Sequence, residues 1–327
     1  MNTIIKKADE TSIAKAVELL QSGEIVAIPT ETVYGLAANA LNSAAIEKIF
    51  AAKGRPRDNP LIVHVTDLEM AKGLGLEIPA IAEELAEKFW AGPLTMIFRR
   101  TVGSVIPEEI SCGLDTAAVR VPNNPAALEI IRHCGVPLAA PSANVSGSPS
   151  PTKAGHVFAD LNGKIPLIID GGTCSCGVES TVIAFEDDKK IRILRPGAVT
   201  AEELGKFAEI IIDEVVLGKN KGGGSPPRSP GTAYKHYSPK AEVIAVIAES
   251  GEEFAKYVDA NKKESDFKLT FSDYADQGAK ILFAKLRELD EFGAKRIFVR
   301  LPKPEGIGLA VYNRLVRAAE FNVVRLS

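Results

Sequence analysis

Apolar residues recur along the first two thirds of the chain with two different spacings. Residues 12–21 place Ile13, Ala16 and Leu20 about one helical turn apart, whereas the unbroken apolar run 25–28 is typical of a buried strand. On the same grounds, further strands are expected at residues 61–65, 95–99, 117–121, 138–140, 167–169, 181–184 and 191–194, and further helices at 44–53, 80–90, 125–134 and 153–161. Because strands outnumber helices, the pattern predicts one large, twisted, mixed sheet rather than a strict βαβ repeat.

The composition changes between Lys219 and Pro239. This segment contains three consecutive glycines, several prolines and no acidic residue, which indicates a linker. After it, strands expected at residues 242–247, 267–271 and 296–300 alternate with helices expected at 252–261, 278–291 and 307–319. That alternation predicts a small Rossmann-like domain with a parallel sheet. The expected domains are therefore residues 1–218 and 240–327, joined by residues 219–239.

The net charge of −3 limits the kinds of partner that the chain is expected to bind. A protein that grips nucleic acid over a large surface usually carries a basic surplus, so any RNA contact is expected to come from a local patch. No run approaches the roughly 18 apolar residues of a membrane helix, and residues 1–11 lack the apolar segment of a signal peptide. We therefore expect a cytoplasmic protein whose four cysteines are reduced thiols, with no membrane partner.

Several common catalytic motifs are missing from the sequence. It contains no GxxxxGK[ST] phosphate loop, no GxSxG nucleophile turn and no HExxH zinc motif. Its four histidines do not stand at metal-ligand spacing, so no metal site built from protein side chains is expected. Gly306 and Gly308 resemble the beginning of a dinucleotide fingerprint, but Val311 stands where a third glycine is needed, and we interpret them as a helix start.

Two polar segments stand out at the ends of predicted elements. The string PTETVYGL, residues 29–36, directly follows a buried strand, where open α/β sheets bind ligands; a turn capped by threonines is the alternative. Lys53, Arg55 and Arg57 lie within five residues, in a loop stiffened by two prolines, at the end of a helix that should stop at Gly54. One cation would satisfy the helix dipole, so three cations favour a phosphate clamp.

Three further segments complete the candidate site. The string PSANVSG, residues 141–147, follows a strand of small residues and offers Ser142 and Asn144 as hydrogen-bonding groups. Arg120 interrupts an apolar strand and needs an anionic partner, either a structural carboxylate or the carboxylate of a substrate. Within the linker, residues 229–239 carry clustered aromatic and histidine side chains, which a plain spacer does not need and a lid over a nucleotide would use.

Taken together, the strings PTETVYGL, KGRPxxxPL, PSANxSG and SPGxxxxHYxP resemble the YrdC family, specifically its long two-domain threonylcarbamoyl-AMP synthases. The resemblance runs from about Ile13 to Pro239, and the C-terminal domain fits by pattern only. It implies a nucleotidyltransferase that makes threonylcarbamoyl-AMP from L-threonine, bicarbonate or CO2, and ATP, with release of pyrophosphate. It also implies that the product serves the modification of adenosine 37 in tRNA.

The resemblance also assigns roles to individual residues. The catalytic Lys-x-Arg and Ser-x-Asn signature falls on Lys53, Arg55, Ser142 and Asn144, which also contact ATP. The implied threonine pocket consists of Thr32, His64, Arg120, Ala140 and Ser180. The other implied ATP contacts are Arg57, Asn59, Thr116, Ser150, Arg195 and Tyr234. Thr232 stands where the family pattern has an apolar residue, which affects the packing of the expected lid.

The resemblance implies partners as well. Mg²⁺ is expected with ATP, held by phosphate oxygens and water, and the product is expected to pass to the tRNA threonylcarbamoyl transferase machinery with weak or no direct tRNA binding. A different class of function stays open, namely an RNA-binding module that uses a cationic groove. The acidic net charge argues against it as the main role.

Overall fold

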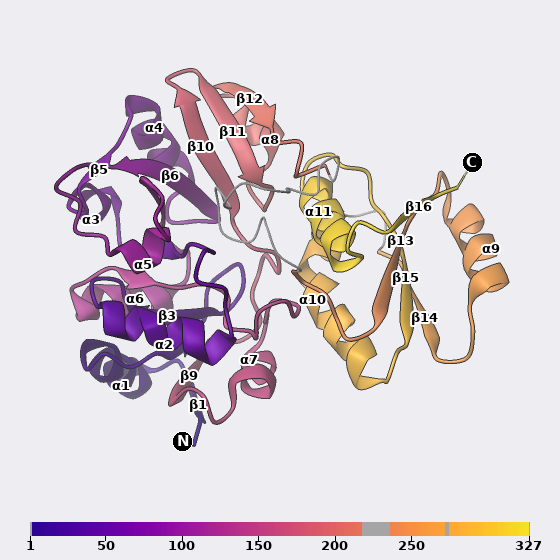
Figure 1. Ribbon diagram of the computed structural model, residues 1–327, viewed down its shortest axis with the longest axis horizontal. Coiled ribbons are helices and arrows are strands. Elements are labelled where there is room, and N and C mark those ends of the chain that lie inside the picture. The colour runs from indigo at the N-terminus through magenta and orange to yellow at the C-terminus, as the bar shows by residue number, and fades with distance from the viewer. Residues whose placement is uncertain (1, 218–235, 272–274, 327) are drawn as a thin grey trace.

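The computed structural model describes residues 2–217, 236–271 and 275–326 and contains two domains (Figure 1). The larger one is built on a 12-stranded sheet in the order β1-β9-β2-β3-β8-β4-β7-β6-β10-β11-β12, with β5 paired to β6. Neighbouring strands are parallel in some pairs and antiparallel in others, so the predicted mixed sheet is confirmed. The smaller domain has a four-stranded sheet, β14-β15-β13-β16, in which every pair is parallel, as predicted.

The strands of the large sheet are Ile4–Lys7 (β1), Val26–Ile28 (β2), Gly35–Asn39 (β3), Ile62–His64 (β4), Leu76–Glu77 (β5), Leu94–Arg100 (β6), Thr116–Arg120 (β7), Leu138–Ala139 (β8), Leu167–Asp170 (β9), Thr181–Asp187 (β10), Lys190–Arg195 (β11) and Glu209–Ile212 (β12). Its helices are Glu10–Gln21 (α1), Ser43–Lys53 (α2), Leu68–Lys72 (α3), Ala80–Phe89 (α4), Glu108–Ser111 (α5), Pro125–Cys134 (α6), Ala154–Leu161 (α7) and Ala201–Leu204 (α8). The small domain contains Glu242–Ile247 (β13), Gly251–Asn261 (α9), Asp266–Leu269 (β14), Ala275–Glu291 (α10), Arg296–Arg300 (β15), Gly308–Ala318 (α11) and Val323–Arg325 (β16).

Local sequence signals set the helix boundaries. The side chain of Asn42 caps α2 by accepting from the Ala45 amide, and Gly54 ends the helix in the left-handed conformation at φ 60°, as predicted. Helix α1 begins two residues before the predicted start at Ser12. The reason is a capping box in which the side chains of Asp9 and Ser12 each accept from the other's backbone amide, so Ser12 lies inside the first turn.

Eight elements were missing from the sequence-based expectation: β1, β3, β5, β12, β16, α3, α5 and α8. Each has five residues or fewer, which is too short for a helical or alternating period to be recognised. The interpretation of Gly306 and Gly308 as a helix start agrees with the beginning of α11. Of the expected linker, residues 219–235 lie outside the described residues.

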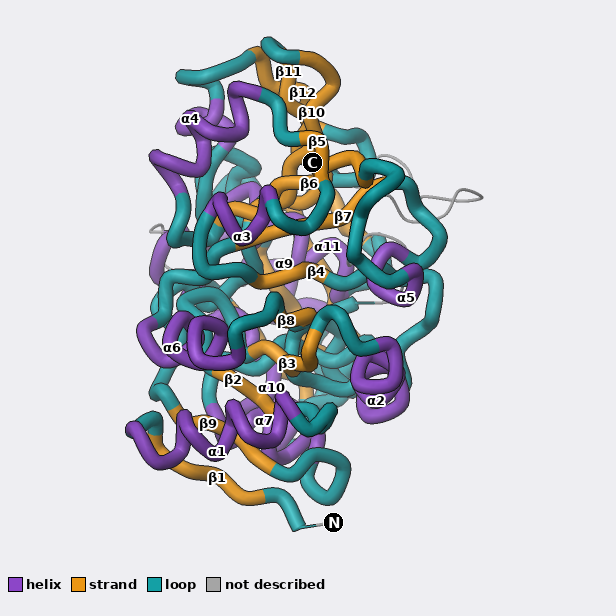
Figure 2. Tube along the Cα trace, turned by 90° about the vertical axis from the view of Figure 1, so that its left-hand side faces the viewer, coloured by secondary structure: helices purple, strands orange, loops and turns teal. Residues whose placement is uncertain are grey.

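In the described part of the chain, helices cover the two faces of the large sheet at one edge but not at the other. Figure 2 shows the strands stacked from β11 and β12 at the top down to β1 at the bottom. In β2, Val26 and Ile28 pack with α1 and α6, whereas Ala27 packs with the core that includes α2 and α7. Successive side chains of a strand point to opposite faces, so helices cover both faces at this end. Farther up, Ile97 and Leu194 belong to a small apolar cluster made of strand residues alone. That face of β4, β6, β7, β10 and β11 is where the candidate site lies.

The small domain presents α10 and α11 to the large domain, while α9 lies on the far side of its sheet (Figure 1). Val33 and Val178 of the large domain belong to the same apolar cluster as Phe283 of α10. The two domains therefore share part of a hydrophobic core. No helix among the described residues is long and apolar enough to span a membrane.

Candidate active site

The PTETVYGL and PSANVSG strings lie side by side although about a hundred residues separate them. The Leu36 amide donates to the Pro141 carbonyl at 2.7 Å, and the Ala143 amide donates to the Tyr34 carbonyl at 2.8 Å. Gly35 makes this approach possible, because a Cβ added there would lie only 3.2 Å from the Cβ of Ala140. Two segments that the sequence analysis marked separately are thus hydrogen-bonded to each other at the candidate site.

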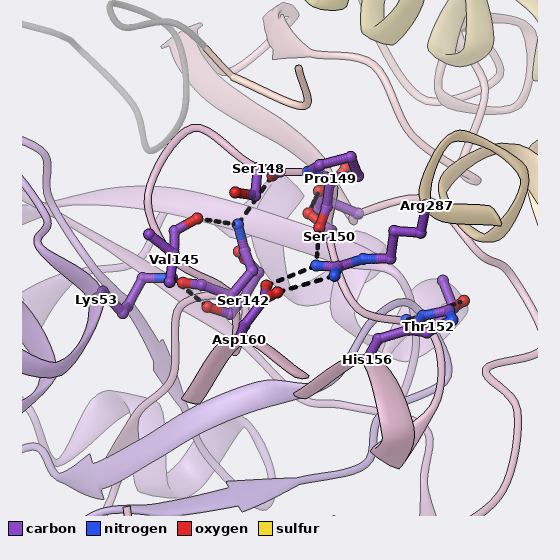
Figure 3. A network of polar contacts seen from close by, with 12 residues as sticks. Lys53, Ser142, Val145, Ser148, Pro149, Ser150, Thr152, His156, Asp160 and Arg287 are labelled. Carbon is purple, nitrogen blue, oxygen red and sulfur yellow. Dashed lines mark hydrogen bonds and ion pairs between the residues drawn. The ribbon is translucent and has the colours of Figure 1, made fainter. Parts of the chain in front are cut away.

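Lys53, the first residue of the KGRPxxxPL string, connects that string to the PSANVSG loop. Its ammonium donates to the Ser142 carbonyl and, at 2.6 Å, to the Asn144 carbonyl, and Figure 3 shows the side chain pointing toward Ser142. The Ser146 amide returns a hydrogen bond of 2.9 Å to the Lys53 carbonyl. Burial, and after it the charge of Arg55, lower the pKa of Lys53 well below its usual value. The Lys-x-Arg and Ser-x-Asn segments are therefore held in a fixed relation by a buried lysine.

Parallel pairing of β4 and β7 brings two of the candidate residues together. His64 and Arg120 are direct partners in this register, at the carboxyl ends of both strands. They line a small cavity of about 60 Å³. The predicted residues that line it are Thr32, Arg55, His64, Arg120, Ala140, Ser142, Ser180 and Arg195. One cavity thus collects all five predicted threonine contacts and several of the predicted phosphate contacts.

Arg120 has a carboxylate partner within the protein. Its Nη2 donates to Glu31 Oε1 at 2.6 Å, and its Nε donates to the Gly92 carbonyl at 3.2 Å. Both alternatives left open by the sequence are therefore relevant, because a structural ion pair exists and Arg120 also faces the cavity. Within the described part of the chain, Glu31 Oε2 has no hydrogen-bond partner.

His64 is held as a neutral imidazole. Burial, and after it the charge of Arg120, lower its pKa to about 3. Nδ1 lies 3.2 Å from the Ile62 carbonyl, which favours the tautomer with the proton on that nitrogen. The other nitrogen, Nε2, then offers a hydrogen-bond acceptor beside Arg120.

Arg55 and Arg195 bring positive charge to the cavity. Arg55 donates to the carbonyls of Asn59 and Pro60 at 3.0 and 2.7 Å, and burial lowers its pKa to about 10, so it stays charged at neutral pH. Arg195 donates to the carbonyl and the hydroxyl of Ser180 at 3.1 and 3.0 Å. The Ser180 hydroxyl also bonds to Thr95 at 2.7 Å. Two fixed guanidinium groups thus face a small polar cavity, which is suited to an anionic ligand.

The remaining predicted residues do not line the small cavity. Arg57 is 76% exposed and pairs with Glu47. Asn144 donates to the carbonyls of Val145 and Ser148, Asn59 is buried, and Ser150 is buried with its hydroxyl on Glu179. Tyr234 lies outside the described residues.

Thr116 lines a second, larger cavity of about 860 Å³ together with Ile97 and Leu194. It stands on the same face of β7 as Ala118 and Arg120, because alternate residues of a strand share a face. Thr116 and Arg120 are four positions apart, about 13 Å along the strand. The two cavities therefore lie along one face of the sheet.

Two family models cover most of the chain. The model of the Sua5, YciO and YrdC proteins, described as "Telomere recombination", matches residues 18–197, and "Threonylcarbamoyl-AMP synthase, C-terminal domain" matches residues 199–320. This chain belongs to the Sua5/YrdC family of threonylcarbamoyl-AMP synthases. The resemblance drawn from the four sequence strings is thereby confirmed.

Relatives of full length support the family membership. The threonylcarbamoyl-AMP synthase of Pyrococcus abyssi is 42% identical over 98% of each chain. That of Bacillus subtilis is 40% identical over 97% of this chain and 95% of its own. The crystal structure of P. abyssi Sua5 complexed with L-threonine matches with a TM-score of 0.90 at 40% identity and covers 100% of this chain and 99% of that one.

Within this Sua5/YrdC fold, sequence reasoning assigned no role to two buried acids, Glu31 and Glu179. Glu31 stands inside the PTETVYGL string, and Glu179 precedes Ser180 and lines the small cavity. An acid at the end of an apolar strand was a usable signal in both cases, because a buried carboxylate needs a partner. Their partners are arginines 89 and 135 residues away in the chain, which local patterns do not reveal.

The described end of the linker also reaches the site. His236 and Tyr237 line the small cavity, and the Ser238 amide donates to the Gly147 carbonyl at 2.9 Å. Burial, and after it the charge of Arg55, lower the pKa of His236 to about 3. Residues 229–235 of the predicted lid, residues 229–239, lie outside the described residues. No group of three or more potential metal-ligating side chains occurs in the part of the chain that the structure describes.

Proposed function

We propose that this protein is an L-threonylcarbamoyladenylate synthase that converts L-threonine, bicarbonate or CO2, and ATP into threonylcarbamoyl-AMP and pyrophosphate. The observation that carries the proposal is the small cavity in which Arg120 and neutral His64 face Arg55 and Arg195. Arg120 and His64 suit an amino acid and Arg55 and Arg195 suit phosphate, in a chain of the threonylcarbamoyl-AMP synthase family.

The reaction needs positioning more than it needs a protein nucleophile. The threonine amine adds to CO2 and loses a proton, which gives a carbamate. A carbamate oxygen then attacks the α-phosphorus of ATP, the bond to the β-phosphate oxygen breaks, and pyrophosphate leaves with that electron pair. Catalysis of such a step rests on alignment, fixed positive charge and exclusion of water. The cavity offers buried cations and short polar side chains, which match these needs.

For threonine, we place the carboxylate on Arg120. Its Nε and Nη2 are engaged, whereas Nη1 has no hydrogen bond within the described residues. The neighbouring His64 Nε2 and the hydroxyls of Thr32 and Ser180 would recognise the polar groups of the substrate, while Ala140 leaves room for it. The threonine complex of P. abyssi Sua5 supports a threonine site in this fold.

For ATP, we place the phosphates near Arg55, Arg195 and Ser142 and the nucleoside along β7 toward Thr116. The support is the face of the sheet along which the two cavities lie, where apolar side chains such as Ile97 and Leu194 offer a surface for a base. Lys53 and Asn144 act in this proposal through the Ser142 loop that they hold. Mg²⁺ would accompany ATP on phosphate oxygens and water, because the groups that line the small cavity are mainly cations and hydroxyls.

We further propose that the product serves tRNA adenosine 37 modification in the cytoplasm and is handed to a separate transferase. The net charge of −3 gives no general affinity for tRNA, so the transferase rather than this chain would hold the RNA. The competing function is an RNA-binding module that uses the cationic face around Arg55 and Arg195. Pyrophosphate exchange into ATP that depends on threonine separates the two, because an RNA-binding module does not catalyse it.

The deciding experiment is product analysis by mass spectrometry with ATP, L-threonine and ¹³C-bicarbonate. A product that contains AMP, threonine and one labelled carbon is expected, with one pyrophosphate released per product. Omission of threonine should abolish both. Formation of AMP without threonine or label would show a different adenylation reaction, and tRNA binding without any pyrophosphate release would favour the RNA-binding module.

A further inference from the structure

Side chains of the small domain enter the large domain beside the candidate site. Arg314 of α11 is 0% exposed and is among the largest fully buried side chains of the described chain. Its neighbour Asn313 donates to the Val216 carbonyl at 2.8 Å. Arg287 of α10 pairs with Asp160 at 2.6 Å and bonds the Pro149 carbonyl, as Figure 3 shows. The small domain thus makes polar contacts with the large domain, and one of them, at Pro149, is on the loop that carries Ser150.

Arg314 makes the most direct of these contacts. Its Nε donates to Glu179 Oε2 at 2.9 Å, and its Nη1 donates to the Pro196 carbonyl at 2.7 Å. Its guanidinium carbon lies 5.4 Å from the ring centre of Tyr237, which is a cation–π distance. Glu179 and Tyr237 both line the small cavity. One buried side chain of α11 therefore contacts three segments that surround the site.

Two of these segments lead to a predicted ATP contact. The second oxygen of Glu179, Oε1, accepts from the Ser150 hydroxyl, and Pro196 directly follows Arg195. The side chain of Arg195 holds Ser180, so the β11 end and the loop before β10 are joined. Glu179 needs a cation because a buried carboxylate is costly without one, and its ion-pair partner within the described residues is Arg314.

Building on the proposed function, we propose that Arg314 is a positioning residue for ATP. It fixes Glu179, and through Glu179 the hydroxyl of Ser150, while it also fixes the backbone beside Arg195. The small domain thereby completes the nucleotide side of the site without a contact to the substrate. The threonine carboxylate depends on Arg120 and His64, which are set by the pairing of β4 and β7. Ser180, next to Glu179, is the one proposed threonine contact beside the Arg314 network, so threonine affinity should change much less than nucleotide affinity.

Ligand binding by the full-length chain tests this inference. Arg314→Met keeps an unbranched side chain in place and removes the ion pair and both hydrogen bonds. Calorimetry should show at least a tenfold rise in the Kd of Mg²⁺ α,β-methylene-ATP, an analogue that cannot release pyrophosphate. The Kd of L-threonine should change less than threefold. Arg314→Lys keeps the positive charge but lacks the planar guanidinium group, so the Kd of the ATP analogue should rise by less than in Arg314→Met.

Two further variants distinguish a loss of ATP positioning from a loss of folding or of the whole site. Arg296→Met breaks an ion pair with Asp266 inside the small domain and should leave both affinities unchanged. Glu179→Gln combined with Arg314→Met removes both buried charges, which protects folding if the single variant is unstable, and should lose nucleotide affinity as the single variant does. Thermal unfolding confirms that each variant is folded before titration.

The outcomes are distinct. Folded Arg314→Met, or the double variant, with unchanged nucleotide affinity would overturn the inference. Equal loss of threonine and nucleotide affinity would also overturn it, because it would indicate collapse of the whole site. Failure of the wild-type protein to bind the ATP analogue would instead overturn the proposed function, together with the inference that rests on it.

Discussion

Arg120 Nη2 lies 2.6 Å from Glu31 Oε1, and the two side chains are only 5% and 7% exposed. The guanidinium is thus oriented by a protein carboxylate before any substrate arrives. A pre-oriented arginine loses less conformational entropy on binding than a free one. The pairing also fixes the position of Glu31 Oε2, which has no partner within the described residues.

Replacement of Arg120 by Met should therefore remove threonine binding. Loss of a desolvated charge-assisted pair costs roughly 2–5 kcal/mol, about a 30-fold or greater rise in Kd. The Kd for the ATP analogue should change less than threefold. Calorimetry with Arg296→Met as control, which breaks the pair with Asp266 inside the small domain, measures both. Unchanged threonine affinity in folded Arg120→Met, or in its combination with Glu31→Gln, would reject this role.

Lys53→Met should lower kcat by about 100-fold or more, since it releases the Ser142 loop, which the proposed function places beside the phosphates of ATP. The KM for threonine should change little. The matched control is Lys48→Met, which removes a lysine of the same helix that bonds the carbonyl of Gly23 at 2.8 Å, away from the site. Pyrophosphate release at the wild-type rate in a folded Lys53→Met protein would contradict the prediction.

Acid should destabilise the protein through His64. Its pKa of about 3 in the folded state lies below the ordinary value of 6.5, so it stays neutral when the unfolded chain binds a proton. The free energy of unfolding therefore falls as pH drops from about 6.5 toward 3, by about 2 kcal/mol at pH 5 for this residue. Urea unfolding at pH 7 and pH 5 should show a smaller pH effect in His64→Gln. An equal pH effect in both proteins would refute the assignment.

Two glycines of one loop provide a test of the domain contact. Both have left-handed backbones, Gly172 at φ 83° and Gly177 at φ 76°, so a side chain strains both alike. A Cβ at Gly172 would meet nothing within 4 Å, whereas at Gly177 it would lie 2.5 Å from the Lys280 Cα of α10. Gly172→Ala should cost about 1 kcal/mol, and Gly177→Ala roughly 1–3 kcal/mol more. Equal losses in urea unfolding would show that α10 does not pack on this loop in solution.

Much of the fold followed from local patterns. Helix α2 shows why, because its apolar spacing, the cap at Asn42 and the stop at Gly54 all point to the same helix. The short strand β3 shows the limit. Its sequence GLAAN has small residues and no alternation, and it becomes a strand because it pairs with β2 and β8. Tertiary hydrogen bonds of that kind are not encoded in the segment itself.

Some residues of the candidate site could likewise be predicted from local sequence, and others could not. Arg120 was marked by its own strand, since a lone cation among apolar residues is unusual. The sequence did not reveal that Lys53 faces backbone carbonyls, because its partners belong to a loop about ninety residues away. Arg314 was equally hidden, as its helix has an ordinary amphipathic pattern and its partner Glu179 lies in the other domain.

The distance along the chain between Glu179 and Arg314 has a consequence for biosynthesis. The two residues are 135 positions apart, and a ribosome that adds roughly 5–20 residues per second needs about 7–27 s to reach the second after the first. During that interval the nascent large domain carries Glu179 without its cation, so the carboxylate keeps its water and the loops around it stay unlocked. The loops around Glu179 therefore reach their final arrangement only late in translation, after α11 has been made.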